Sequence, residues 1–243
     1  MQLVRRWLRM ATAPALVACV AMPARAQGRP APVNAATIVQ QGNGHGAPAC
    51  IACHGPQLLG NAAGGFPRIA GQNADYIQAQ LAALANGTRK NAVMLPVASS
   101  LSAAERQALA AYISALPVPA APPTSVDSGV SAASPAALSR GERLATRGDW
   151  PRGLPGCDQC HGPGGIGVGA AFPPLAGQPA LYITNQLAAW QQKTRAGGPL
   201  DLMAAIANRM TPADVAAAAA YYAAQPPRPA PHAARATPAG SRP

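Results

Sequence analysis

Aromatic residues are scarce in this chain, which has two Phe, three Trp and five Tyr among its 243 residues. Large aromatic side chains supply much of the buried area of an ordinary core. Small domains with so few of them bury little surface from the polypeptide alone. The composition therefore predicts that something other than side chains completes the core.

Charged residues are also few. They make up 11% of the chain, with 19 Lys and Arg against 8 Asp and Glu. Four of the arginines lie within residues 1–26, and without them the balance is 15 against 8, a net charge of +7. No stripe of Lys and Arg follows, so the sequence argues against a nucleic-acid partner.

Long apolar runs are absent after residue 26, so no mature segment is expected to span a bilayer. Three of these four arginines, Arg5, Arg6 and Arg9, precede an apolar run, Met10 to Met22, that is too short to cross a membrane. Ala24-Arg25-Ala26 fits a small-x-small cleavage site. These features predict a signal peptide over residues 1–26 and export to the periplasm.

Cysteine is limited to five residues. One of them, Cys19, follows Leu16-Val17-Ala18 in a pattern that resembles a bacterial lipoprotein box, so lipid anchoring at Cys19 is an alternative to cleavage after Ala26. Both interpretations export the protein. The mature chain then holds four cysteines, and all four fall in one repeated motif.

The repeated motif is C-x-x-C-H, at residues 50–54 and 157–161. It is the attachment signature of a c-type haem. Residues i, i+3 and i+4 share one face of a helical turn, so two thiols can add to one porphyrin while the histidine reaches its iron. The predicted attachment residues are Cys50, Cys53, Cys157 and Cys160, and the predicted iron ligands are His54 and His161. Two covalent haems would supply the apolar core that the composition lacks.

The similarity between the two halves extends beyond the motif. Each copy is followed by F-P-x-[IL]-A-G-Q, then Y-I-x-x-Q-L-A-A, then M-x-x-[VI]-A-x-x-[LM]-[ST]. We therefore predict a tandem duplication of one small all-α haem domain, over residues 34–116 and 136–225. A Pro/Ala/Ser-rich linker is expected over residues 117–135, and a disordered tail over residues 226–243.

Capping signals predict where several helices begin. Asn73 is expected to cap one helix, Ser102 opens a capping box, and Thr211 precedes a helix with proline at its first position. Pro179 is expected as the first residue of another helix. The segment that carries Met94 is predicted to be a loop.

An iron held by histidine needs a sixth ligand if it is to be a closed electron-transfer centre. The mature chain has three methionines, and the repeat pairs Met94 with Met203, whereas Met210 pairs with Leu101. We predict that Met94 and Met203 bind iron and that Met210 fills the core.

Two other matched pairs each have two interpretations. Pro67 and Pro173 can offer the carbonyl that accepts the second ring N–H of a haem histidine, or can simply form a turn. Arg89 and Arg195 precede the methionine segments and can pair with haem propionates, or lie in solvent. The residues alone leave both pairs open.

These segments resemble those of the dihaem cytochrome c4 family and, more broadly, class I cytochromes c, over residues 34–225. The resemblance implies two helical single-haem domains related by a pseudo-two-fold axis, with their propionate edges facing each other. It also implies that the carbonyls of Pro67 and Pro173 orient the haem histidines. The short segment before Cys50, the longer linker and the arginine-containing tail depart from the family, and they bear on the domain interface and on the choice of partner.

The resemblance further implies a periplasmic carrier that delivers single electrons to a membrane cytochrome c oxidase, often after quinol–cytochrome c reductase. Two alternatives stay open: the cytochrome subunit of a periplasmic dehydrogenase complex, and a dihaem enzyme such as a peroxidase. A matched methionine in each domain and the lack of a spare mature cysteine favour the carrier, because an enzyme needs an open or labile iron position. We therefore predict no enzymatic activity.

Overall fold

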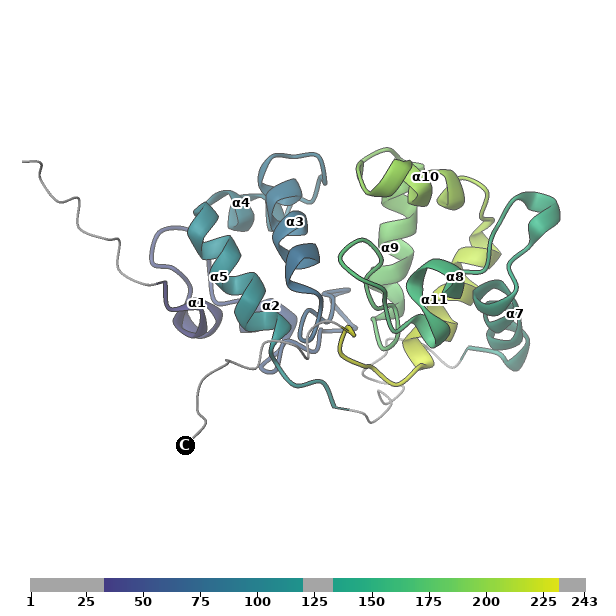
Figure 1. Ribbon diagram of the computed structural model, residues 1–243, viewed down its shortest axis with the longest axis horizontal. Coiled ribbons are helices and arrows are strands. Elements are labelled where there is room, and N and C mark those ends of the chain that lie inside the picture. Colours follow the sequence, from purple (N-terminus) through teal and green to yellow (C-terminus); the bar gives the residue numbers. More distant parts are fainter. Residues whose placement is uncertain (1–32, 120–132, 232–243) are drawn as a thin grey trace, which may run out of the picture. The chain divides into compact units, whose positions relative to one another are not determined.

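The computed structural model describes residues 33–119 and 133–231, which fold into helices joined by turns (Figure 1). These two ranges contain isolated β-bridges but no strand. The prediction of an all-α fold is therefore confirmed. The predicted signal peptide with Cys19, residues 120–132 of the predicted linker and residues 232–243 of the predicted tail lie outside the described residues.

Two sets of helices follow the duplication. The first set is α1 (Ala35–Gln41), α2 (Ile51–His54), α3 (Ala74–Ala85), α4 (Met94–Ser99) and α5 (Ala103–Ser114). The second set is α7 (Pro135–Thr146), α8 (Asp158–His161), α9 (Ala180–Gln191), α10 (Leu202–Ala207) and α11 (Pro212–Ala224), with 3-10 turns at Trp150–Arg152, Pro163–Gly165 and Pro199–Asp201. The short helices α2 and α8 carry the two C-x-x-C-H motifs.

The predicted helix caps are present. The side chain of Asn73 accepts hydrogen bonds from the first turn of α3. Ser102 forms a reciprocal capping box at the start of α5, and Thr211 does the same at the start of α11, which has proline at its first position. Local sequence therefore fixes where these helices begin.

Two predicted boundaries are wrong. Met94 begins α4 and is not in a loop, because the Asn91 side chain accepts a hydrogen bond of 2.8 Å from the Met94 N–H and so caps the turn. Pro96 is tolerated in this helix because the first turn needs no intrahelical bond from its nitrogen. Pro179 is the N-cap of α9 and not its first residue.

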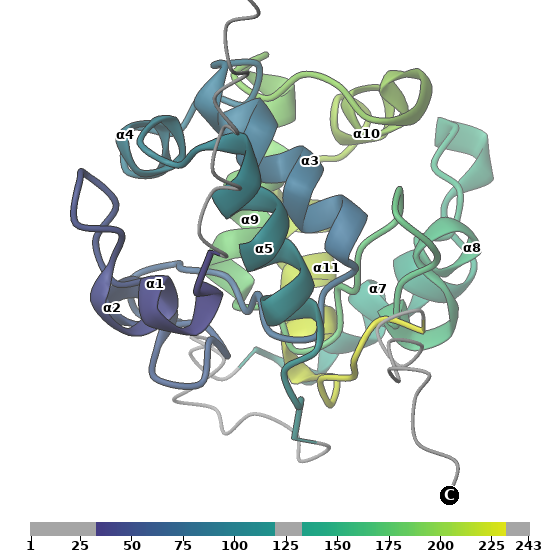
Figure 2. The ribbon, with the colours of Figure 1, turned by 60° about the vertical axis from the view of Figure 1, so that its left-hand side comes forward.

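The first set of helices packs around α5. Leu109 and Ile113 of α5 are buried in one apolar cluster with Ile38 and Val39 of α1. The same helix packs against α3, which in turn contacts α4 (Figure 2). Cys50 and Ile51 are partly buried and pack against this cluster, so the first motif lies at the edge of the core.

The second set packs around α11. Its closest neighbour is α7, where Gly141 faces the α11 backbone: a Cβ at position 141 would overlap the carbonyl oxygen of Ala217. The helix α11 also contacts α9, and α9 in turn contacts α10. A glycine inside α7 is thus explained by close helix packing, despite its cost in helix propensity.

The chain beyond α11 returns to the first set of helices. The backbone N–H of Ala230 donates to the carbonyl oxygen of Gly71 at 2.7 Å, and Ala230 is buried. Pro227 packs against Gly177 of the second set. Residues 226–231 therefore have defined contacts, which differs from the expectation of a disordered tail starting at residue 226.

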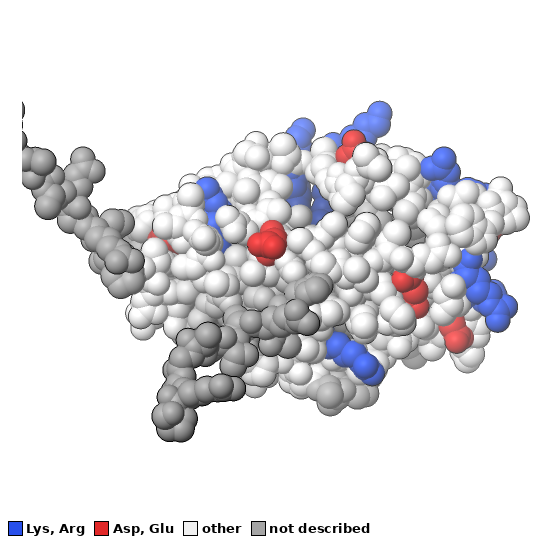
Figure 3. All heavy atoms as spheres, viewed as in Figure 1, with Lys and Arg blue, Asp and Glu red and all other residues white. Residues whose placement is uncertain are grey.

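Within the described ranges, no helix is long and apolar enough to cross a membrane. Figure 3 shows Lys and Arg side chains scattered among uncharged residues on the face in view, with Asp and Glu between them. This face has no continuous basic stripe of the kind that binds nucleic acid.

Candidate metal centres

Each C-x-x-C-H motif forms one tight helical turn. The N–H of His54 donates to the carbonyl of Cys50 at 3.0 Å, and the N–H of His161 donates to that of Cys157 at 2.9 Å. This turn puts the two cysteines and the histidine of each motif on one face. The four predicted attachment cysteines are half-buried free thiols, with no disulfide among them.

Both histidines are buried and oriented by a proline carbonyl. His54 is 7% exposed and its Nδ1 lies 2.9 Å from the carbonyl oxygen of Pro67. His161 is 6% exposed and its Nδ1 lies 2.8 Å from that of Pro173. A carbonyl can only accept, so Nδ1 carries the hydrogen and Nε2 keeps its lone pair. Each ring is therefore held in the tautomer that binds a metal through Nε2.

Burial keeps these imidazoles neutral. Desolvation lowers the pKa of His54 and of His161 below the ordinary value, and the hydrogen bond to each proline carbonyl only partly opposes it. Burial acts in the opposite direction on the thiols: it raises the pKa of Cys50, and raises that of Cys157 to about 11. At neutral pH the motifs thus present two neutral imidazoles, with Cys50 and Cys157 as protonated thiols.

A phenylalanine flanks each histidine ring. Phe66 meets His54 edge-on, with ring centroids 6.2 Å apart, and Phe172 meets His161 in the same way at 6.0 Å. Each phenylalanine directly precedes the proline that accepts the Nδ1 hydrogen. Sequence reasoning gave these rings no role, although both copies of the F-P segment contain one.

The two predicted methionine ligands lie on equivalent helices. Met94 is the first residue of α4 and Met203 the second residue of α10, and both are half-buried. Met203 and Met210 both pack against the core cluster of the second set, as Cys157 does. Iron ligation by Met94 and Met203 therefore stays a prediction based on the duplication.

Arg89 and Arg195 meet between the two sets of helices, which belong to one compact unit from Val33 onward. Each guanidinium donates to the glutamine of its own set and to the tyrosine and glutamine of the other set, at 2.7–3.2 Å. These partners are Gln80, Tyr76, Gln186 and Tyr182. The repeated Y-I-x-x-Q segment was the sequence signal for them, but sequence reasoning did not assign it this role.

This arginine cluster carries two positive charges, and within residues 33–119 and 133–231 it has no acidic partner. Arg195 is buried and stacks over the ring of Trp190 at 4.1 Å, and Arg89 is half-buried. Neither forms an ion pair with a carboxylate among the described residues. Burial alone would raise the pKa of Tyr182, but the charges of Arg89 and Arg195 outweigh it and lower that pKa. The cluster therefore favours an anion.

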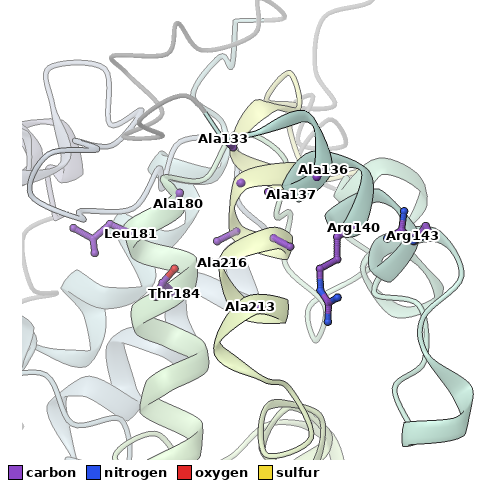
Figure 4. Close-up of a pocket in the computed structure, with 13 residues that line it drawn as sticks. Ala133, Ala136, Ala137, Arg140, Arg143, Ala180, Leu181, Thr184, Ala213 and Ala216 are labelled. Atoms are coloured by element: carbon purple, nitrogen blue, oxygen red, sulfur yellow. The ribbon is translucent and has the colours of Figure 1, made fainter.

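An open groove lies elsewhere, between α7, α9 and α11 (Figure 4). It is lined mostly by alanines, with Arg140 and Arg143 on one side. Arg140 is bound to Asp214, the buried acid of the α11 capping box. Neither motif histidine lines this groove, so it is separate from the two centres.

The donor sets fit a covalently attached iron porphyrin. Each turn supplies two free thiols and one buried neutral imidazole with its Nε2 lone pair available. Three such groups on one helical turn match the attachment chemistry of a c-type haem.

Comparison with known proteins agrees with this fit. Residues 37–113 and 139–221 each match a family model described as "Cytochrome C oxidase, cbb3-type, subunit III". The "Thiosulfate dehydrogenase electron acceptor" of Thiomonas intermedia is 49% identical over 180 residues, which cover 74% of this chain and 80% of that relative. "Cytochrome c4" of Pseudomonas aeruginosa is 34% identical over 175 residues, which cover 71% of this chain and 81% of that relative.

One solved structure matches both sets of helices at a TM-score of 0.71 and 39% identity. It is titled thiosulfate dehydrogenase (TsdBA) from Marichromatium purpuratum, in its as-isolated form. The match covers 79% of this chain, and this chain spans 40% of the length of that one.

Proposed function

Because the chain belongs to the dihaem cytochrome c4 family and carries two covalently bound haem c groups, we propose that it accepts electrons from a periplasmic dehydrogenase that oxidises thiosulfate and passes them to a membrane cytochrome c oxidase. Electron transfer is a property of the family. The donor, the acceptor and the periplasmic location are what we propose for this chain. The relatives are electron-transfer cytochromes, so the dihaem peroxidase is not retained as an alternative.

The choice of donor rests on the relative from Thiomonas intermedia. That protein is 49% identical and is named as an electron acceptor of thiosulfate dehydrogenase. The cytochrome c4 relative is 34% identical. Quinol–cytochrome c reductase, expected from the family resemblance, is the competing donor. A terminal oxidase as acceptor is likewise supported by that resemblance.

In this function, the protein's residues hold the iron in a fixed environment. When bound, each haem exchanges one electron between its ferric and ferrous states. The hydrogen bonds from His54 to Pro67 and from His161 to Pro173 fix the ring orientation and increase the basicity of the ligand. Rigid ligands need little rearrangement when the charge on iron changes, which suits outer-sphere transfer.

Met94 and Met203 are proposed as the sixth ligands. The duplication pairs them, and they lie on the equivalent helices α4 and α10. A thioether raises the potential relative to a second imidazole, and it closes the last coordination position. A closed iron favours a carrier over a catalyst, because no substrate can bind it directly.

Arg89 and Arg195 are proposed to bind haem propionates. Two buried or half-buried guanidiniums, joined through tyrosine and glutamine side chains, call for anions that the described carboxylates do not supply. A propionate from each haem would provide that charge. The arginines would then hold the two centres in a fixed relation across the interface.

The test compares two donors. Oxidised protein is mixed with catalytic amounts of a purified thiosulfate dehydrogenase, with and without thiosulfate, and haem reduction is followed by absorbance. A parallel reaction uses quinol–cytochrome c reductase and a quinol. We expect fast thiosulfate-dependent reduction, followed by reoxidation when oxidase-containing membranes are added. Reduction by the reductase alone would overturn the proposed donor.

A further inference from the structure

The two repeats differ at the residue that follows the proline whose carbonyl contacts the motif histidine. The first copy reads Pro67-Arg68, whereas the second reads Pro173-Pro174. Arg68 has a backbone N–H, and Pro174 has none. The peptide group next to the first histidine can therefore donate a hydrogen bond that its counterpart cannot.

Arg68 uses this N–H to contact the other domain. Its backbone N–H donates to Oε1 of Gln178 at 3.0 Å, and Nε2 of Gln178 donates back to the Arg68 carbonyl at 2.8 Å. The guanidinium of Arg68 also donates to the carbonyl of Ala176 at 3.1 Å. Arg68 is 1% exposed and Gln178 is 3% exposed, so water cannot replace these bonds.

One peptide group joins this contact to the first metal centre. Its C=O belongs to Pro67 and accepts the Nδ1 hydrogen of His54, while its N–H belongs to Arg68 and donates to Gln178. An amide that donates at nitrogen becomes a stronger acceptor at oxygen, by about 10–30% for each added bond in a chain. Gln178 is thus linked to His54 by a continuous set of hydrogen bonds.

No reciprocal path leads to the second centre. The carbonyl of Pro173 holds His161, but the nitrogen of that peptide belongs to Pro174 and carries no hydrogen. Gln72 is the counterpart of Gln178 in the repeat. Its Nε2 reaches only the Arg68 carbonyl in its own domain, at 3.3 Å, and its buried Oε1 has no protein partner in the described part of the chain.

We propose that Gln178 is a positioning residue for His54, so that the second domain sets the potential of the first haem while the first domain does not set that of the second. The proposal rests on the proposed role of His54 as an iron ligand. Without Gln178, the Pro67 carbonyl would accept more weakly and the imidazole would be a weaker donor to ferric iron. The potential of the first haem then rises.

The main test is Gln178→Leu in the full dihaem protein. Both potentials are measured by spectroelectrochemistry, with each haem assigned through the ligand variants Met94→Ala and Met203→Ala. We expect the redox equilibrium of the first haem to shift about threefold toward the reduced form, ~28 mV at 59 mV per tenfold for one electron. The second haem should move much less. Equal shifts of both haems, or no shift of the first, would overturn the proposal.

Gln72→Leu is the matched control, because it makes the same substitution at the equivalent buried position. It should leave the first haem close to its original potential, since Gln72 does not bond to the Arg68 N–H. A shift of the first haem as large as that of Gln178→Leu would indicate a general loosening of the interface and would overturn the proposal.

A second pair of variants removes the N–H alone. Arg68→Ala and Arg68→Pro both lose the guanidinium, but only the proline lacks the backbone donor, as Pro174 does naturally. The first haem of Arg68→Pro should have the higher potential of the two, and equal potentials would overturn the proposal. These measurements need no partner protein, so they can fail or succeed independently of the dehydrogenase assay.

Discussion

His54 and His161 each use one ring nitrogen in a hydrogen bond with the protein and leave the other available for a metal. Nδ1 donates to a proline carbonyl, and Nε2 keeps a lone pair. Burial lowers the pKa of both rings, so neither needs to lose a proton at neutral pH before it binds iron. These two residues are therefore prepared as ligands by the fold.

The sixth ligands can be tested residue by residue. Met94→Ala and Met203→Ala should each remove the contribution of one haem to the methionine–iron(III) charge-transfer band and lower the potential of that haem. Met210→Ala should leave the band intact and cost only packing. Loss of the band in Met210→Ala, with its retention in Met203→Ala, would show that the assignment is wrong.

Asp214 is expected to stabilise the second domain through its charge. Burial alone would raise the pKa of Asp214, but hydrogen bonds from Arg152 and Thr211 lower it well below the usual range. Asp214→Ala leaves those donors without their acceptor. It should lower the free energy of unfolding at pH 7 by about 3 kcal/mol, as measured by denaturant titration.

The acid dependence of this effect follows from the lowered pKa. The stabilisation is complete above the ordinary carboxyl range and is lost as the pH falls through the folded pKa, so Asp214→Ala and the natural protein should converge in acid. Glu142→Ala, which removes an exposed carboxylate with no ion pair in the described ranges, is the control and should change little at any pH. A constant difference across pH would contradict the charge argument.

Residue-level prediction from sequence is strongest where the chemistry is local. C-x-x-C-H puts three groups within one turn, so its spacing alone predicts the histidines and the thiols. The proline carbonyls lie 13 and 12 residues after their histidines, so the residues alone left their role open and the family resemblance favoured it. Phe66 and Phe172 escaped notice because an aromatic ring beside a proline has no spacing that distinguishes it from core.

At the scale of elements, the contact between α7 and α11 depends on a missing side chain. Gly141→Ala would place a methyl group against the Ala217 carbonyl and should destabilise the protein by about 1–3 kcal/mol, despite the better helix propensity of alanine. Ser139→Ala, at an exposed position of the same helix, should stay within ~0.5 kcal/mol of the natural protein. Thermal or denaturant unfolding distinguishes the two. A stabilising Gly141→Ala would contradict the close contact.

Helix starts were predictable when the cap was adjacent to an apolar repeat, as at Asn73, Ser102 and Thr211. The start of α4 was not, because its cap is the Asn91 side chain in a stretch with no periodicity. A six-residue helix such as α4 is too short to show a 3.6-residue pattern. Its stability comes from the packing of its residues on α3, which local sequence does not reveal.

For the whole molecule, the first expectation is two covalent haems per exported chain. Intact mass spectrometry of protein purified after export should show two haem additions and loss of residues 1–26. A mass that begins at Cys19 with acyl groups would establish the lipoprotein alternative. One haem addition alone would contradict the assignment of two centres.

The second expectation is that both irons are closed to small ligands. The reduced protein should bind carbon monoxide poorly at neutral pH and show negligible peroxide turnover, because the proposed histidine and methionine ligands would leave no coordination position open. Rapid binding to one haem in freshly purified protein, together with peroxide turnover, would contradict a pure carrier.

The interface between the two domains was beyond sequence reasoning. Its bonds join residues such as Arg68 and Gln178, or Arg89 and Gln186, that lie 110 and 97 positions apart, and no periodicity links such pairs. The duplication did show that Arg89 and Arg195 occupy equivalent places. It could not show that they face each other across the interface.

The hydrogen bond from Ala230 to Gly71 has a consequence for how this gene can be recombined. The residues after α11 follow the second domain in the chain but complete a surface of the first. An exchange of second domains between relatives would bring a foreign segment onto that surface unless residues 226–231 were kept with the first domain. Chimaeras joined at the linker should therefore fold best when both Gly71 and this segment come from the same parent.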